Sequence, residues 1–358
     1  MVERIFKSDE ERERIESFLR KEHFSSKQIN NFLGDYTQQD SPFFFEYLNE
    51  ESTTNISAIK LILKSEKENK SPISREVEDF EGFLKSKKLT MNEGLSIYRY
   101  TFYGEEILKL KRSGKSAKDE IKLMGKQLKK SFIKFGKKDI LKNYKIINSL
   151  IEFAKILNPF EEFTAVQQKT EKFLKGFHFE SALYYECINF VYDVMNTIRL
   201  QNNITDLDKS LKNQIPYNMV VYRAINPSYL DLSKSIIKNP ETLLGQKINQ
   251  NGYTSTSLRY ENSFAKYSQY PLVLKIFVPK GTQGLDISRL SSMPNEEEVL
   301  LNSCDLFIFN VSSFVDDKNS KYEGKIYANA VAISKDRKCY KDIGKSFSTT
   351  MEVASENS

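Results

Sequence analysis

The sequence predicts an α+β protein of two domains, with helices packed on mixed β-sheets. Two observations predict this class. Through the first half of the 358 residues, apolar side chains recur three and four positions apart, which is the period of a helix. After about residue 215 they gather instead in short β-branched and aromatic runs bounded by Pro, Asn and Gly. Strands bunched after a helical region, rather than alternating with helices, are typical of α+β architecture.

Helices are predicted from the amino terminus onward, and the whole stretch to about residue 90 is expected to be helical. The segment 9–24 opens with acidic residues, which favour a helix start, and places Ile15, Phe18 and Leu19 on one face. Further helices are expected at 116–132, 142–158, 160–177 and 182–200.

Strands are expected only in the last part of the chain. The runs that predict them are 218–225, 251–258, 270–281, 296–301, 305–314 and 324–333. None of them is followed by a Gly-rich phosphate loop, so the sequence does not predict a dinucleotide fold of the Rossmann type.

The net positive charge of the chain comes entirely from its first half. The formal net charge is +6, and residues 1–158 hold 31 Lys and Arg against 25 Asp and Glu, whereas 159–358 hold 23 of each. The excess concentrates in 108–145, which could face nucleic acid, an acidic membrane or an acidic partner. A solvated helix face is the favoured interpretation. Nucleic acid is not expected, because the stretch has too few aromatic residues for base stacking.

Cysteine and histidine usage argues against several kinds of site. Cys187, Cys304 and Cys339 are widely spaced and have no clustered histidines, so we expect free, buried thiols and no disulfide, zinc or other metal site. The two histidines, His23 and His178, have no nucleophile motif beside them, which argues against histidine-based catalysis.

The chain shows no sign of a membrane span or a secretory signal. No apolar run approaches the roughly 20 residues of a membrane-spanning helix. The amino terminus is charged from its third residue and lacks the apolar segment of a signal peptide. Secretion by another route, secretion with a leader that has been removed, and a cytoplasmic location all stay open.

A weak internal echo predicts that one ancestral unit occurs twice. Residues 31–49 are similar to 172–189, and 83–100 are similar to 210–224, in the same order. The first copy shows no counterpart of the polar motifs described below. We therefore expect a degenerate, helix-rich first domain over 1–158 and an active domain over 159–358.

Three motifs in the second half carry the chemistry. Arg223 ends one predicted strand, Ser255, Thr256 and Ser257 lie inside another, and the acidic triplet 296–298 precedes a third. A strand alternates its side chains, so the two serines are expected on one face and Thr256 on the other. By the same rule Glu296 and Glu298 would enter a cleft together, while Glu297 stays in solvent; its role is otherwise open.

Together these motifs resemble the arginine-STS-glutamate signature of the toxin-type mono-ADP-ribosyltransferases. The resemblance covers roughly 160–340 and is closest in "GYTSTSL", "PLVLKIFVPKGTQGLDI" and "MPNEEEVLLN". It implies that NAD is the substrate and that no metal takes part. In that reading Arg223 anchors the pyrophosphate, Ser255 holds the catalytic carboxylate, Glu298 stabilises the ribosyl cation, and Glu296 faces the incoming nucleophile.

The resemblance also implies further NAD contacts. Tyr185 and Asn189 resemble the tyrosine and asparagine that the family presents beside the nicotinamide mononucleotide half of NAD. The serine-threonine motif, 255–257, would line the same site. Phe264 or Tyr267 would stack on the nicotinamide ring, although Phe264 could equally be a core residue.

Position 296, two residues before Glu298, holds a glutamate rather than a glutamine. In this respect the sequence resembles the family members that modify arginine. The implied activity is transfer of ADP-ribose from NAD to a target-protein arginine, with NAD glycohydrolase side activity. The arrangement resembles the enzymatic component of binary toxins, including the vegetative insecticidal type. Actin would then be the target, the first domain would dock on a separate translocation component, and the protein would be secreted to act in the target-cell cytoplasm.

Two other interpretations stay open. One is an intracellular or phage-carried transferase that modifies a bacterial protein such as RNA polymerase. The other is a non-enzymatic binding module with a decayed site, against which the intact arginine, serine and glutamate motifs count. The "MPNEEE" turn also lacks the aromatic residue that family members often place there to contact the substrate protein, which weakens the assignment of the acceptor.

Overall fold

The protein divides into two compact units. The computed structural model describes residues 2–37, 55–65, 74–137, 139–158, 162–225, 239–260, 270, 272–314 and 325–340. Unit 1 comprises Met1–Asn55 and Asp208–Ser358, and unit 2 comprises Ile56–Leu207. These boundaries differ from those of the predicted domains 1–158 and 159–358, whose assignment stays a prediction.

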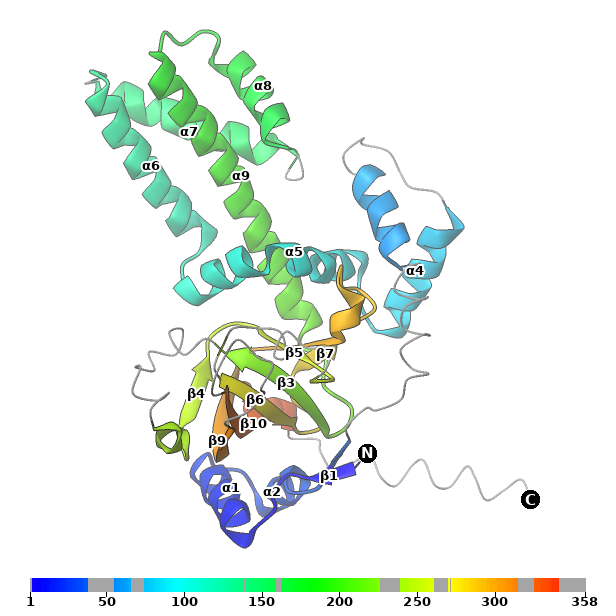
Figure 1. Ribbon diagram of the computed structural model, residues 1–358. Helices are drawn as coiled ribbons and strands as arrows, with labels where there is room; N and C mark the ends of the chain where they lie inside the picture. Colours follow the sequence, from blue (N-terminus) through cyan, green and yellow to red (C-terminus); the bar gives the residue numbers. More distant parts are fainter. Residues whose placement is uncertain are drawn as a thin grey trace. The chain divides into compact units, whose positions relative to one another are not determined.

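Unit 1 is built on a mixed ten-stranded sheet (Figure 1). The strand order is β4-β9-β10-β6-β3-β5-β8-β7, with β2 beside β3 and β1 beside β2. The β6–β10 and β2–β3 pairs are parallel, whereas the remaining pairs in this sheet are antiparallel. The strands are β1 (Val2–Arg4), β2 (Asp35–Thr37), β3 (Met219–Ile225), β4 (Lys247–Gln250), β5 (Thr254–Ser257), β6 (Leu272–Val278), β7 (Gly284–Asp286), β8 (Glu298–Leu301), β9 (Cys304–Phe314) and β10 (Lys325–Ser334).

All six predicted strand runs contain a strand, and the mixed sheet agrees with the predicted α+β class. The expectation that the chain is helical to about residue 90 is wrong at β1 and β2. These three-residue strands pair with each other, and β2 also pairs with β3, where Thr37 lies opposite Met219. Their conformation depends on that distant strand, which no local pattern in the sequence reveals.

Both faces of the sheet in unit 1 are buried. On one face, helices α1 (Asp9–Lys21) and α2 (Ser26–Phe32) pack against alternate strand residues such as Tyr222 and Phe277. Serine side chains at positions 8 and 25 cap the two helices by accepting hydrogen bonds from backbone amides in the first turn. The opposite face holds Val221, Leu274 and Ile276 in a second core. The alternation of period two therefore fixes the register of the sheet.

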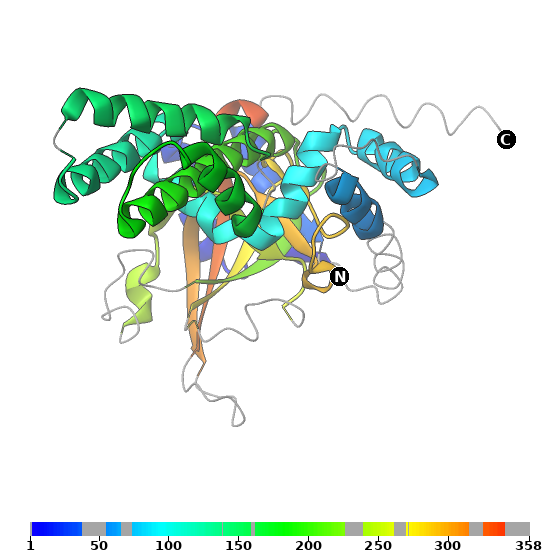
Figure 2. The same cartoon turned by 90° about the horizontal axis from the view of Figure 1, so that it is seen from above.

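The described elements of unit 2 are helices (Figure 2). They are α4 (Arg75–Ser86), α5 (Met91–Ser113), α6 (Ala117–Lys134), α7 (Ile140–Ile156), α8 (Phe163–Leu174) and most of α9 (Ser181–Ser210), with a further helical segment at 55–65. Helices α6 to α9 share one core around residues such as Phe132, Leu150 and Val191. The four predicted helices from 116 to 200 are thus confirmed.

The degenerate first copy is not confirmed. The echo of 83–100 with 210–224 pairs the end of α4 and the start of α5 with the end of α9 and strand β3. The two stretches therefore differ in secondary structure. Strands β1 and β2, near the amino terminus, belong to the sheet of unit 1.

Candidate functional site

Arg223 lies on strand β3, beside strand β5. The two strands pair at Tyr222 and Ser257. The Nη1 of half-buried Arg223 donates a hydrogen bond to the backbone oxygen of Ser255, at 2.6 Å. This bond holds the guanidinium at the serine motif.

Strand β5 divides its hydroxyl side chains between two faces. In the antiparallel pairing with β8, Ser255 lies opposite Leu300 and Ser257 lies opposite Glu298, so both serines share a face with that glutamate. Thr256 lies on the other face and is buried, and its hydroxyl donates to the backbone oxygen of Val299 at 2.7 Å. The structure therefore places Thr256 in the packing of the sheet, away from the two serines.

The acidic triplet forms a turn and not an extended segment. Glu296 ends the 3₁₀ turn η3 (Pro294–Glu296), Glu297 is left-handed with φ 46° and ψ 53°, and Glu298 begins β8. The expectation that Glu297 stays in solvent is wrong, because its side chain is 1% exposed and its Oε2 lies 3.2 Å from Nε of Arg259. The left-handed residue breaks the alternation of a strand. Arg259 is a residue that the motif analysis missed.

The Glu298 carboxyl has an unusual electrostatic environment. It is 6% exposed, and burial raises its pKa from the ordinary 4.5 to about 7. A hydrogen bond from the Ser255 side chain lowers that pKa, the charge of Glu296 raises it, and the charge of Arg223 lowers it. Ser255, Glu296 and Arg223, all in unit 1, therefore each influence the Glu298 carboxyl. Burial also raises the pKa of half-buried Glu296.

Four of the predicted residues do not belong to the described part of unit 1. Tyr185, which is 56% exposed, and Asn189 lie one helical turn apart on α9, in unit 2. Phe264 and Tyr267 lie outside the described residues. The group formed by Arg223, the two serines and the two glutamates belongs to unit 1 alone.

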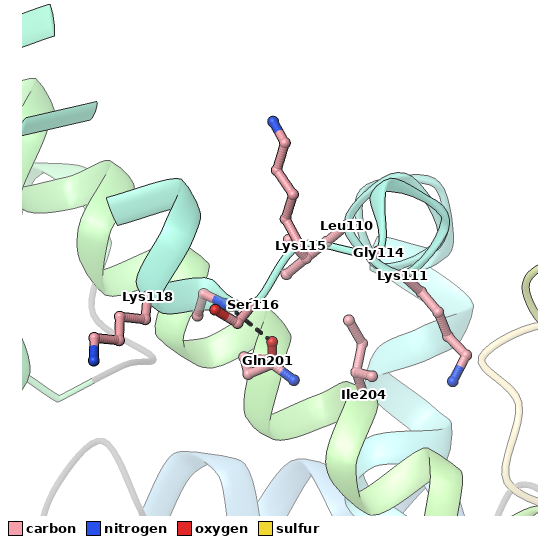
Figure 3. Close-up of a pocket in the computed structure, with 9 residues that line it drawn as sticks. Leu110, Lys111, Gly114, Lys115, Ser116, Lys118, Gln201 and Ile204 are labelled. Atoms are coloured by element: carbon pink, nitrogen blue, oxygen red, sulfur yellow. Dashed lines mark hydrogen bonds between the residues drawn. The ribbon is translucent and has the colours of Figure 1, made fainter. Parts of the chain in front are cut away.

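A pocket in unit 2 contains none of the predicted site residues. This cavity of about 460 Å³ lies where α5 ends, α6 begins and α9 passes, beside Gln201 and Ile204. Figure 3 shows the side chains of Lys111, Lys115 and Lys118 pointing in different directions. Lys115 pairs with Glu120 at 3.1 Å. The lysines therefore do not converge on one anion.

Other features of the described residues bear on the predicted chemistry. Cys187, Cys304 and Cys339 are buried and free, as the sequence predicts. Within the described part of the chain, no cluster of three or more His, Cys, Asp or Glu could hold a metal ion. None of the described helices is long and apolar enough to cross a bilayer.

Comparison with known families identifies the stretch that carries this site. Residues 189–331 match the family model of the ADP-ribosyltransferase exoenzymes. The match includes Arg223, the serine motif and the acidic triplet, and begins four residues after Tyr185. It confirms the resemblance to the toxin-type ADP-ribosyltransferases. No curated protein matches the chain.

Several solved structures are similar to part of the chain. Plx2a, an ADP-ribosyltransferase toxin from Paenibacillus larvae, is 22% identical over 38% of this chain and 72% of its own, with a TM-score of 0.32. BECa of a binary enterotoxin of C. perfringens, solved with NADH, is 21% identical over 48% of this chain and 40% of its own, with a TM-score of 0.35. The enzymatic component C2-I of the C2-toxin from Clostridium botulinum is 18% identical over 47% and 44%, with a TM-score of 0.33.

Proposed function

We propose that the chain transfers ADP-ribose from NAD to an arginine of a target protein, with Arg223, Ser255, Glu296 and Glu298 as its catalytic group. The observation that carries this proposal is the buried Glu298 carboxyl. It accepts a hydrogen bond from the Ser255 side chain, and the charges of Arg223 and Glu296 shift its pKa. The match of residues 189–331 to the exoenzyme family supports it.

Arg223 would bind the pyrophosphate of NAD. A guanidinium offers two parallel N–H donors to phosphate oxygens, and such charge-assisted bonds are stronger than neutral ones. The hydrogen bond from Arg223 to the Ser255 backbone orients the guanidinium before NAD arrives. Binding at this point would bring the nicotinamide ribose to Glu298.

Glu298 would act when the nicotinamide bond breaks. Nicotinamide leaves with the electron pair of its bond to C1′, and positive charge develops on the ribose ring. An ionised carboxylate already held in place lowers the free energy of that cation. Ionisation of Glu298 is needed, and the cationic nicotinamide ring of bound NAD favours it by lowering the carboxyl pKa.

Glu296 would complete the transfer. A nitrogen lone pair of the acceptor guanidine forms the new bond to C1′, and Glu296 takes the proton that this nitrogen loses. Half-burial raises the pKa of Glu296, which makes it a better base than an ordinary glutamate. Water attacking in place of the guanidine gives NAD glycohydrolase activity.

The acceptor and the route of delivery rest on the resemblance alone. Actin is our first candidate for the target. A separate translocation component is the proposed partner of the predicted first domain, residues 1–158, in a secreted toxin that acts in the target-cell cytoplasm. An intracellular or phage-carried transferase that modifies a bacterial protein such as RNA polymerase is the alternative. Labelling a eukaryotic and a bacterial lysate in parallel, followed by mass spectrometry of the modified peptide, distinguishes the two.

Incubation with NAD labelled in its ADP-ribose part tests the activity itself. Glu298→Ala is expected to lose both transfer and NAD hydrolysis, whereas Glu296→Ala is expected to lose mainly transfer. Glu241→Ala, which removes an exposed carboxylate of unit 1, serves as a matched control and keeps both. Equal activity in the four proteins contradicts the mechanism, and NAD binding without turnover in the wild type indicates a binding module.

A further inference from the structure

Glu297 has a backbone conformation that is unusual for a residue other than glycine. Its left-handed conformation brings its Cβ close to the backbone and is adopted mostly by Gly, Asn and Asp. Two hydrogen bonds accompany it. The Glu297 amide donates to the oxygen of Pro294 at 3.1 Å, and the Glu297 oxygen accepts from the amide of Leu258 at 3.0 Å. The turn between the two catalytic candidates therefore depends on contacts outside the triplet.

The Glu297 side chain is held by a charged partner. Its carboxylate is 1% exposed, and Nε of Arg259, which is 18% exposed, lies 3.2 Å from Oε2. A carboxylate this deeply buried is strongly disfavoured unless it is paired with a cation. Arg259 thus allows the Glu297 side chain to be buried. The side chains of Glu296 and Glu298 are left for other contacts.

The ion pair lies at the end of a ladder that carries the site. Ser257 and Glu298 form the last described pair between β5 and β8. Glu297 lies one residue beyond this pair and Arg259 two residues beyond it on the other strand. The serine strand and the glutamate turn are therefore joined by a charged contact at their open end. A shift of this end would move Glu298 relative to Ser255.

We propose that Arg259 and Glu297 are positioning residues, whose buried ion pair holds the glutamate turn in the geometry that presents Glu296 and Glu298 to NAD and the acceptor. This inference rests on the proposed function. It also gives the middle acid of the triplet a role. Arg259 compensates one of three adjacent negative charges and leaves two carboxylates for the reaction.

The effect of the pair acts through geometry. The charges that shift the pKa of Glu298 are those of Glu296 and Arg223. Removal of Arg259 is therefore expected to change the position of the Glu298 carboxyl rather than its pKa. Misplacement of a reacting group by about 1 Å can lower the rate on the order of 100-fold. Binding of NAD depends on Arg223 and is expected to stay the same.

The test compares kcat and KM for NAD hydrolysis in Arg259→Met, Arg259→Lys, Glu297→Gln and the Arg259→Met/Glu297→Gln double variant. Each of Arg259→Met and Glu297→Gln is expected to lower kcat about 100-fold with KM for NAD unchanged. Arg259→Lys keeps the charge and is expected to retain more activity than Arg259→Met. The double variant is expected to be no worse than either single one, because both remove the same contact.

Controls separate positioning from folding. Arg12→Met removes a surface ion pair of unit 1, between Arg12 and Glu16 at 2.9 Å, and is expected to keep full kcat. Circular dichroism confirms that each protein is folded. The double variant removes both charges of the pair, so it stays informative if a single variant, which leaves one of them, unfolds.

The outcomes distinguish this inference from the proposed function. Unchanged kcat in the folded variants, or losses that multiply in the double variant, overturn the positioning role while leaving an active wild type in place. A wild type that does not cleave NAD overturns the proposed function, and the positioning role with it.

Discussion

Replacing Glu298 with Gln should change how the stability of the protein depends on pH. A pKa of about 7 in the folded protein, against the ordinary 4.5, corresponds to roughly 3 kcal/mol that favours the protonated acid in the fold. Because the folded state holds this proton more tightly than the unfolded chain, the free energy of unfolding falls as pH rises from about 4.5 to about 7. Gln cannot ionise, so Glu298→Gln should lack this decrease.

Urea unfolding at a series of pH values measures the effect. The chain has no Trp and 19 Tyr, so tyrosine fluorescence or far-UV circular dichroism is the signal. The stability of Glu298→Gln minus that of the wild type should increase by roughly 3 kcal/mol between pH 4.5 and pH 8. The exposed-site variant Glu241→Gln should show no comparable trend. Parallel pH profiles for the wild type and Glu298→Gln would refute the burial argument.

Three further predictions follow from the same geometry. The kcat/KM for NAD hydrolysis should rise with pH through about 7, because Glu298 must be ionised in the free enzyme. A pH profile of kcat/KM that is flat from acid to alkaline pH contradicts this. Arg223→Lys should weaken NAD binding by about 10- to 100-fold in calorimetry, since hydrogen bonds to charged groups contribute roughly 1.5–3 kcal/mol, and an unchanged affinity would remove the phosphate anchor. Thr256→Val should lower stability by about 1 kcal/mol through loss of its bond to Val299 and leave the affinity for NAD unchanged; weaker NAD binding would place this hydroxyl in the site.

The strands of unit 1 were largely predictable because their signal is local. Runs such as "PLVLKIFV" are long and β-branched, and each contains a strand of the sheet. The short strands β4 and β7, like β1 and β2, were not predicted. They have three or four residues, and their pairing with β9 and β8 stabilises them. Such strands depend on tertiary neighbours more than on composition.

The candidate site was predictable in its residue types and only partly in its geometry. Alternation correctly separates Thr256 from Ser255 and Ser257, because β5 is a regular strand. The same rule fails at the acidic triplet, where a left-handed residue follows a 3₁₀ turn. Burial of Glu297 depends on Arg259, a residue far away in the sequence that comes close only when β5 and β8 pair.

A crystal structure of the protein with NAD tests the central claim most directly. The account predicts pyrophosphate oxygens within hydrogen-bond distance of the Arg223 guanidinium and the nicotinamide ribose against the Glu298 carboxylate. NAD bound at another place, with neither Arg223 nor Glu298 in contact with it, would contradict the claim.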